Sequence, residues 1–536
     1  MFDGSLTMFR AIFAILAIFC IVGDAANVAV INTYLTHSHF AFLIKLTDIL
    51  TDEGHNVTMI VTELDKSRDT PMPKKARIIV RSEFSSNPML HGKSEQTFWN
   101  DGFEFMNTRK MYTQYTTAIE AQCERFLTDS EFIESMKSEQ FDIAMIEPSD
   151  FCGYGFLKLI GLENYVNVFP MALSEKFALA LGLPGRTFEP FPSAYDYHPE
   201  LSYWERLTNY FYPILLHYVN TFDEGGISAS VVRKYVDPNF HMNDAVGHAR
   251  FTFLNTEEHM DFPRPISHKV IYVGGITVAN SSADDLAEDY KQIFETSKKG
   301  VVLVSFGTVA KASLIPPKIK QAFLGMFAAF PEISFIWKYE NTSDTVANDL
   351  PNVFKKPWIP QSTVLAHLKM LAFITHGGMN SVMEAGHAGV PLLGVPLFGD
   401  QARNLKMLEY RKIAITIDKT ELTASNLIAA MHKLTDDDSY RTRARTIAAL
   451  ARTKPLSGKQ RFIAYFNHAV QFVHAEDHLD IGHRKLDTFR YYNLDIYLTI
   501  LAVVFVLIAT SILLRFYIVI KPLIMLNNKP LSTKIE

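Results

Sequence analysis

Short apolar runs alternate with amphipathic stretches over the first third of the chain. The run VAVI at 28–31 is rich in β-branched residues, which is typical of a buried parallel strand. Apolar positions spaced along one helix face follow at 42–50, and the apolar run VTMIV comes next at 57–61. This order predicts a strand–helix–strand unit. The runs at 141–146 and 165–169 predict two further strands.

A second series of the same kind fills the C-terminal half. Its predicted strands are 301–305, 333–338, 371–375, 390–394 and 414–417. Its predicted helices are 317–329, 378–388, 400–411 and 423–434. Strands that alternate regularly with helices are typical of a doubly wound parallel sheet, so the sequence predicts an α/β protein.

The stretch between the two series, 261–275, has the proline and glycine content of a hinge. We therefore predict two Rossmann-like domains that face each other across a cleft, at 26–262 and 276–490, with a linker at 263–275. A proline-rich stretch at 184–200 is predicted to be a loop. Ligands of such folds bind beyond the carboxyl ends of the strands, so we expect the site in the cleft.

Both ends of the chain are strongly apolar. The uncharged run at 11–22 is too short to cross a hydrocarbon core of about 30 Å, so it predicts a signal peptide over 1–25; a buried first helix is the alternative. The uncharged run at 496–514 is long enough to span a bilayer. The residues after it, 515–536, are then a cytosolic tail.

These two segments predict a type I single-pass membrane protein whose body lies in the lumen or outside the cell. Lys534, third from the end, corresponds to half of a dilysine retrieval signal, and we expect the endoplasmic reticulum as the location. Asn56, Asn280 and Asn341 begin glycosylation triplets; the last two lie in polar loops and are the better candidates.

Composition narrows the class of protein further. Of the 536 residues, 48% are hydrophobic and 20% charged, which excludes a disordered chain. The net charge of −5 leaves no basic excess for a nucleic-acid partner. After removal of the leader two cysteines remain, Cys123 and Cys152. They would form one bridge if they lie close together, which the sequence leaves open.

The strongest chemical signal follows the predicted strand 371–375. The sequence continues His376-Gly377-Gly378 and then enters a predicted helix. Paired glycines let a ligand approach the backbone, and the first N–H groups of a helix favour an anion, so the stretch predicts a phosphate or diphosphate site. His376 would donate to a phosphate oxygen. Asn380 and Glu384 share one helix face, where the carboxylate would accept from ribose hydroxyls.

Other candidates for ligand contact stand at the ends of neighbouring elements. Ser305 ends a predicted strand and Thr308 lies in the loop after it, although a plain turn has the same pattern. Trp358 would stack on a planar base or would be a half-buried core residue. Asp400 and Gln401 would bind sugar hydroxyls or would cap the helix that follows.

The stretch FITHGGMNSVMEAGHAGVP at 373–391, with Trp358, Gln361 and Asp400-Gln401, resembles the signature of the UDP-glycosyltransferase family, membrane-anchored enzymes that face the lumen. The segments at 263–265 and 273–275 resemble that family's interdomain stretch. The resemblance implies a GT-B fold, a UDP-sugar donor, and inverting transfer to a small lipophilic acceptor. It also implies that no metal and no cofactor takes part.

The resemblance implies a role for each donor residue. Trp358 and Gln361 would hold the uracil and Glu384 the ribose, while Asp400 and Gln401 would hold the sugar. The diphosphate would be held by a larger set: Ser305, Thr308, His376, Gly378, Asn380 and Ser381.

The first domain supplies a candidate base. His39 follows the first predicted strand and opens a helix, where the helix dipole disfavours the imidazolium and favours a neutral ring. His37 is the alternative. The family usually has an aspartate at the end of the strand at 141–146 to orient the histidine. Here Glu147 takes that place, and Asp150 is the alternative.

We therefore predict an enzyme that transfers glucose or glucuronic acid from a UDP-sugar to a hydroxyl of a small lipophilic acceptor, a detoxification reaction. A non-catalytic membrane-anchored protein that binds sugars or lipophiles on the same fold is the alternative. The acceptor pocket is expected around 90–120 and 180–220. Besides the donor, the acceptor and the membrane, a second copy of the chain is a candidate partner.

Overall fold

The computed structural model describes residues 25–34, 37–63, 72–81, 98–99, 105–183, 201–208, 226–279, 282–486, 488–491 and 493–527. The predicted leader, the proline-rich loop at 184–200 and much of the predicted acceptor pocket lie outside these residues. The chain forms two compact units, Met1–Asp480 and Ile481–Glu536, and each is described by itself.

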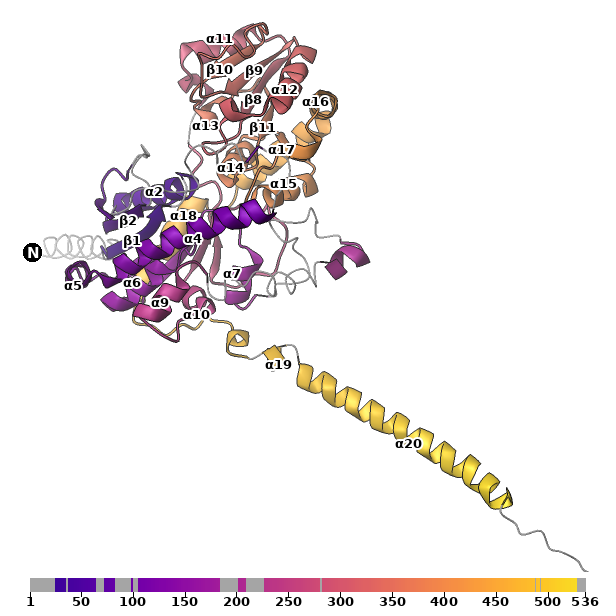
Figure 1. Ribbon diagram of the computed structural model, residues 1–536. Helices are drawn as coiled ribbons and strands as arrows, with labels where there is room; N and C mark the ends of the chain where they lie inside the picture. Colours follow the sequence, from indigo (N-terminus) through magenta and orange to yellow (C-terminus); the bar gives the residue numbers. More distant parts are fainter. Residues whose placement is uncertain are drawn as a thin grey trace, which may run out of the picture. The chain divides into compact units, whose positions relative to one another are not determined.

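The first domain is built on a seven-stranded sheet in which every pairing is parallel (Figure 1). In spatial order its strands are β3 (Arg77–Arg81), β2 (Asn56–Glu63), β1 (Asn27–Tyr34), β4 (Ile143–Ile146), β5 (Tyr165–Phe169), β6 (Thr252–Leu254) and β7 (Val270–Tyr272). The central strands β1 and β4 are almost wholly buried, which agrees with the apolar runs VAVI and IAMI that they contain.

Helices follow most of these strands and bury one apolar face. They are α2 (His37–Asp52), α4 (Phe105–Thr128), α5 (Ser130–Ser138), α6 (Cys152–Ile160), α7 (Glu175–Ala180), α9 (Ala229–Tyr235) and α10 (Met242–Gly247). Helix α2 buries Phe42, Leu43 and Leu46 against the sheet, as its spacing predicts.

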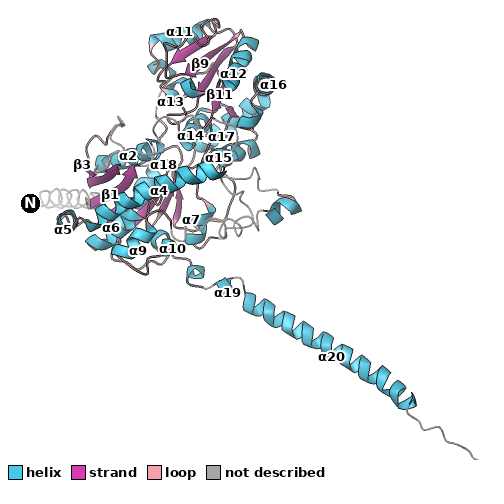
Figure 2. Cartoon of the chain, in the orientation of Figure 1, coloured by secondary structure: helices cyan, strands magenta, loops and turns pink. Residues whose placement is uncertain are grey.

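The second domain has a six-stranded sheet, again with every pairing parallel. The spatial order is β10 (Val353–Lys356), β9 (Ile333–Lys338), β8 (Gly300–Ser305), β11 (Met370–Thr375), β12 (Leu392–Gly394) and β13 (Ala414–Thr416). Helices cover both faces (Figure 2): α11 (Glu288–Thr296), α12 (Pro317–Ala329), α13 (Gln361–Leu365), α14 (Met379–Ala388), α15 (Gln401–Tyr410), α16 (Ala424–Asp436) and α17 (Asp438–Arg452).

The last helix of the body, α18 (Gly458–Gln471), packs on the first domain. Phe462, Phe466 and Ala469 belong to the first domain's core, and the Phe462 ring lies 4.9 Å from that of Phe253 on β6. The structure thus differs from the predicted second domain at 276–490, because the apolar face of α18 is complementary to the first sheet. The predicted linker 263–275 also contains β7, a strand of that sheet.

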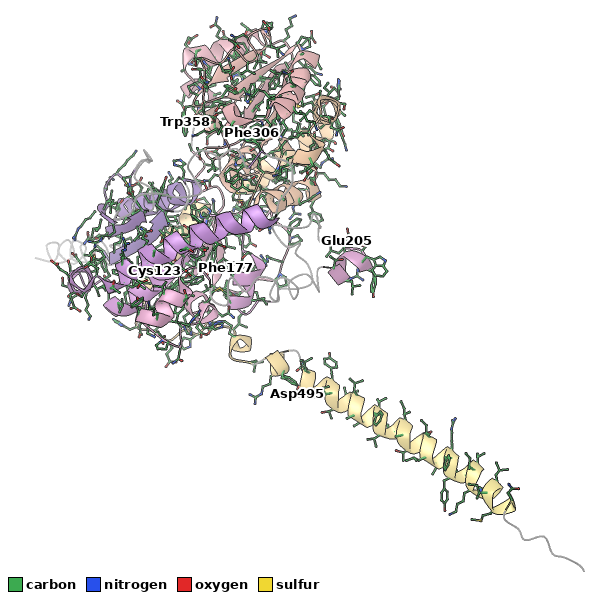
Figure 3. All side chains as sticks on the ribbon, in the orientation of Figure 1. Cys123, Phe177, Glu205, Phe306, Trp358 and Asp495 are labelled. Atoms are coloured by element: carbon green, nitrogen blue, oxygen red, sulfur yellow. A yellow bond between two sulfur atoms is a disulfide. The ribbon has the colours of Figure 1, made fainter. Side chains whose placement is uncertain are left out.

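A disulfide joins Cys123 on α4 to Cys152 at the start of α6 (Figure 3). The two Cα atoms are 5.6 Å apart, within the range that a bridge requires. The bridge, which the sequence left open, ties α4 to the segment that follows β4.

The second unit contains α19 (Thr488–Tyr491) and the long helix α20 (Leu494–Asn527). Residues Leu494–Met525 of α20 are long and apolar enough to cross a membrane. The helix therefore includes the predicted span at 496–514 and continues beyond it to Asn527, with Pro522 inside the helix.

Removal of the disulfide should lower stability without abolishing the fold. For the double variant Cys123→Ala/Cys152→Ala we expect the free energy of unfolding to fall by roughly 2–4 kcal/mol, because the unfolded chain regains the freedom of a closed loop. Thermal unfolding of the detergent-solubilised protein checks this. The wild type in reducing agent is the control, and equal melting temperatures in all three samples would contradict it.

Candidate active site

A cavity of about 740 Å³ lies between the carboxyl ends of the two sheets. His39 and every residue predicted to contact the donor line it, from elements far apart in the sequence: Ser305, Thr308, Trp358, Gln361, His376, Gly378, Asn380, Ser381, Glu384, Asp400 and Gln401. Glu147 lies behind His39 and has a side chain only 3% exposed. The structure therefore brings the whole predicted set together.

His39 and Glu147 form a close pair. β1 and β4 are neighbours in the first sheet, so the residues that follow them meet at one edge. The Nδ1 atom of His39 lies 2.5 Å from Oε1 of Glu147. Asn32 and Ser149 donate to the same carboxylate, at 3.1 and 2.5 Å, and fix its orientation. Glu147 is thus held in the place that the sequence predicts for the orienting carboxylate.

The alternative carboxylate, Asp150, is bound elsewhere. Its Oδ2 atom accepts from the Thr33 hydroxyl at 2.6 Å, and its Oδ1 atom accepts from the backbone N–H of Cys152 at 3.1 Å. Its contacts stabilise the loop and the start of α6.

The pKa of His39 differs from the prediction of a neutral ring. Burial lowers this pKa, but the charge and hydrogen bond of Glu147, with a contribution from Asp400, outweigh burial and raise it above its ordinary value. The helix start at His37 favours the neutral form, as predicted, yet a carboxylate in direct contact acts more strongly than a dipole. His39 is therefore a stronger base than a free histidine.

The stretch after β11 forms a tight turn into α14. Gly377 has a φ of 86°, and a Cβ there would lie 2.6 Å from Leu405. A Cβ on Gly378 would lie 2.7 Å from Nε2 of His376, so a side chain there would displace that ring, whereas the positive φ makes Gly377 the position that requires glycine. Gly378 is the N-cap of α14 and offers no side chain to its first N–H groups, which leaves the helix start suited to an anion.

The surroundings of His376 favour a neutral ring. Burial, reinforced by the positive charge of Lys338, lowers the pKa of His376 to about 4. A neutral imidazole still carries one N–H, so His376 can donate to a phosphate oxygen, as predicted, without adding charge.

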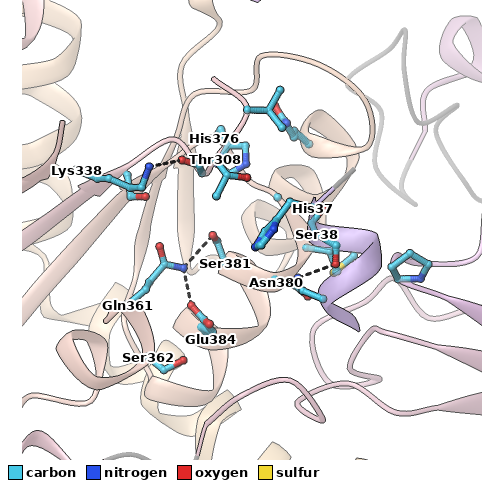
Figure 4. Close-up of a pocket in the computed structure, with 18 of the residues that line it drawn as sticks. His37, Ser38, Thr308, Lys338, Gln361, Ser362, His376, Asn380, Ser381 and Glu384 are labelled. Atoms are coloured by element: carbon cyan, nitrogen blue, oxygen red, sulfur yellow. Dashed lines mark hydrogen bonds between the residues drawn. The ribbon is translucent and has the colours of Figure 1, made fainter. Parts of the chain in front are cut away.

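Lys338 is a site residue that the sequence did not reveal. It ends β9, lines the cavity, and donates from Nζ to the Gly307 carbonyl at 2.9 Å (Figure 4). Its Nζ atom also donates to Glu340 at 2.9 Å. The Nζ atom also lies 5.9 Å from the centre of the Trp358 ring. The sequence predicts the strand at 333–338, and a lysine at the carboxyl end of such a strand is the signal by which Lys338 could have been found.

The residues predicted to hold the uracil and the ribose are hydrogen-bonded to one another. Gln361 donates from Nε2 to Glu384 at 2.5 Å and to Ser381 at 3.0 Å (Figure 4). Burial raises the pKa of Glu384, while bonds from Gln361 and Ser362 act in the opposite direction. Trp358 is 64% exposed, so its ring is free to stack on a base.

Three predicted donor residues also have structural contacts. Asn380 accepts from Asn255 at 2.9 Å and donates to the Ser38 carbonyl at 3.4 Å, so its amide joins the two domains. Gln401 accepts from the N–H groups of residues 397 and 398, and Asp400 accepts from Asn404 at 2.8 Å. These contacts hold the turn before α15 in shape.

Comparison with known proteins identifies the class. The profile described as UDP-glucoronosyl and UDP-glucosyl transferase matches residues 28–525. A putative UDP-glucuronosyltransferase of Caenorhabditis elegans, ugt-47, is 29% identical over 88% of this chain and 89% of its own; human UDP-glucuronosyltransferase 3A2 is 28% identical over 84% and 86%.

Solved structures agree on the fold. The glycosyltransferase of kitacinnamycin has a TM-score of 0.57 at 16% identity, covering 83% of this chain and all of its own. A UDP-glucose:anthocyanidin 3-O-glucosyltransferase in complex with UDP has a TM-score of 0.56 at 14% identity, covering 84% and 99%. The fold is GT-B, which confirms the predicted fold class.

The chain belongs to the UDP-glucuronosyl and UDP-glucosyl transferase family. It is an enzyme that transfers a sugar from a UDP-sugar.

The low pKa of His376 predicts a specific loss of stability in acid. An unfolded histidine titrates near 6.5, so the contribution of His376 is complete above that pH and is lost as the pH falls from about 6.5 towards 4. Melting temperatures measured from pH 7 to 4.5 should fall more steeply for the wild type than for His376→Asn. Parallel curves for the two proteins would contradict the lowered pKa.

Proposed function

We propose that transfer occurs by inversion at the anomeric carbon, with His39 as the base. With Nδ1–H donated to Glu147, the Nε2 atom of His39 is left to take the proton of an acceptor hydroxyl. The acceptor oxygen bonds to the anomeric carbon as the bond from that carbon to the UDP oxygen breaks. The observation that best supports this scheme is the 2.5 Å His39–Glu147 contact at the edge of the cavity that holds the donor residues.

The leaving UDP is stabilised by fixed groups of the second domain. The start of α14 supplies backbone N–H groups, His376 supplies a neutral N–H, and Lys338 supplies a positive charge at the same cavity. These groups would offset the charge that develops on the diphosphate without a metal or cofactor, which is the expectation from the resemblance.

The transferred sugar is proposed to be glucose or glucuronic acid, held by Asp400 and Gln401. The acceptor is proposed to be a small lipophilic molecule with a hydroxyl group, consistent with a role in detoxification.

We further propose that the body lies in the lumen of the endoplasmic reticulum, anchored by α20. This rests on the apolar leader, which is outside the described residues, and on the C-terminal helix. Of the glycosylation triplets, Asn341 lies exposed in a turn after β9. Asn56 donates to Asn27 at 3.1 Å, and Asn280 is outside the described residues.

His39→Ala should lose turnover while it keeps the donor site. We expect kcat to fall by roughly 10²–10⁴-fold, the usual contribution of a positioned general base, with the dissociation constant of UDP unchanged. Steady-state kinetics and calorimetric titration with UDP measure the two quantities. Retained turnover would reject His39 as the base, and lost UDP binding would indicate a damaged fold.

Glu147→Gln and Asp150→Asn form a matched pair. Glu147→Gln should slow turnover by roughly 10²-fold or more, as for carboxylates that hold a histidine tautomer, whereas Asp150→Asn should have a much smaller effect. Because Glu147 raises the pKa of His39, the acid limb of the rate profile should also move to lower pH in Glu147→Gln. A profile that stays in place, or a larger effect of Asp150→Asn, would reject the assignment.

Lumenal orientation predicts a glycan on Asn341. Endoglycosidase H treatment of the protein from microsomes should increase its mobility on a gel, and Asn341→Gln should reduce that shift. Asn56→Gln is the control, for which we expect no change because Asn56 begins β2 and its triplet continues into the buried part of that strand. A wild-type protein insensitive to the enzyme would argue against the orientation.

A further inference from the structure

Two aromatic residues that belong to the first domain by sequence are buried in the second. Phe98 and Trp99 are 7% and 0% exposed. Trp99 is part of the apolar cluster that covers one face of the second sheet, together with Val304 of β8 and Trp337 of β9. A short piece of the first domain's chain is therefore anchored in the other domain, in the stretch around 90–120 where the acceptor pocket is expected.

Each of the two rings has an aromatic partner. The Trp99 ring meets the Phe306 ring edge-on at a centroid distance of 4.9 Å. The Phe98 ring lies 4.4 Å from that of Phe398. In addition, Lys419 donates from Nζ to the Phe98 carbonyl at 3.4 Å. Both side chains and one backbone carbonyl thus contribute to the anchor.

These partners stand inside the two loops that carry donor residues. Phe306 lies between Ser305 and Gly307, in the loop after β8. Phe398 comes two residues before Asp400, and its own N–H donates to Gln401 at 2.9 Å. The donor residues of both loops line the cavity. Each aromatic contact is therefore only one or two residues along the chain from a donor residue, so a change in the contact would shift that residue.

We propose that Phe98 and Trp99 are positioning residues for the UDP-sugar: a first-domain anchor that holds both donor loops in their binding shape. The proposal rests on the donor roles proposed for Ser305, Thr308 and Asp400. Trp99 packs against the loop assigned to the diphosphate, and Phe98 packs against the loop assigned to the sugar. The affinity for the donor then depends on both domains, because Phe98 and Trp99 belong to the first domain, which is expected to bind the acceptor.

The chemistry of Trp99 supplies a conservative variant. In the described part of the chain its Nε1 atom is buried without a hydrogen-bond partner, so the ring serves as an apolar body and its N–H contributes nothing to the anchor. Trp99→Phe keeps an aromatic edge toward Phe306 and removes only the unpaired N–H and part of the ring. It should therefore retain donor affinity, which Trp99→Ala should lose.

The test uses the full-length protein in detergent. Phe98→Ala, Trp99→Ala and Trp99→Phe are compared with Phe330→Ala, a control from the same apolar cluster with matched burial. Phe330 is 6% exposed and has one ring contact, 4.8 Å from His432, but it lies at the end of α12 and not in a donor loop. The quantities measured are the Kd of UDP, the KM of the UDP-sugar that the wild type turns over, kcat, and the melting temperature.

Trp99→Ala should raise both the Kd of UDP and the KM of the UDP-sugar about three- to tenfold, the scale of one aromatic pair. Phe98→Ala should raise the KM of the UDP-sugar by a similar factor with a smaller change in the Kd of UDP, because its loop is assigned to the sugar. In both variants kcat should change less than KM. Trp99→Phe should stay within about twofold of the wild type, and Phe330→Ala should lower the melting temperature only.

Unchanged KM values in folded Phe98→Ala and Trp99→Ala would overturn the proposal, as would an equal rise in Phe330→Ala. If Trp99→Ala does not fold, Phe98→Ala decides the outcome. A wild type that binds no UDP would reject the donor site as well, whereas normal UDP binding with unaffected variants rejects the positioning role alone.

Discussion

The parallel direction of the strands is the constraint on which the site depends. In a parallel sheet all carboxyl ends meet at one edge, and the helix that follows each strand begins there. β1 and β4 are neighbours, so His39 and Glu147 come together. β8 is paired on either side with β9 and β11, so the loop after Ser305 meets Lys338 and His376. Groups separated by long stretches of sequence thereby line one cavity.

Two of the histidines that line the cavity, His39 and His376, show how environment can separate the roles of one residue type. His39 touches a buried carboxylate, and its pKa is raised; His376 is buried beside a lysine, and its pKa is lowered. The first is suited to gain a proton during the reaction, and the second is suited to donate a hydrogen bond while it stays uncharged. Opposite neighbours, rather than any difference in the ring, distinguish the proposed base from the proposed phosphate-binding group.

The sequence was sufficient to predict features that depend on residues close together along the chain. Apolar runs located the buried strands to within a few residues, and the helix over 317–329 has the predicted bounds. It was not sufficient for strands whose patterns are weak: β10 is only half-buried with two lysines, and β6 has three residues. The strand β7 was obscured by the prolines before it, which resemble a hinge.

The same limit applies to the site. Most of the residues proposed to bind the donor stand in or beside a motif and could be listed from the sequence. Contacts that depend on the meeting of the domains, such as Asn380 with Asn255 or Phe98 with Phe398, have no signal in either segment alone. The pKa of His39 was misjudged for a related reason, because the helix start is visible in the sequence whereas the distance to Glu147 is not.

The return of α18 to the first domain has a practical meaning for the boundaries of a soluble enzyme. A truncation placed at the end of the second sheet's helices, after Arg452, would remove Phe462 and Phe466 from the core of the other domain and expose the apolar surface they cover. Beyond α18, Arg250 donates to the carbonyls of Val473 and Ala475, so the chain remains attached to the first domain past the helix. Lys269 also pairs with Asp477, so a form that ends before Ile481, the first residue of the second unit, would keep these contacts.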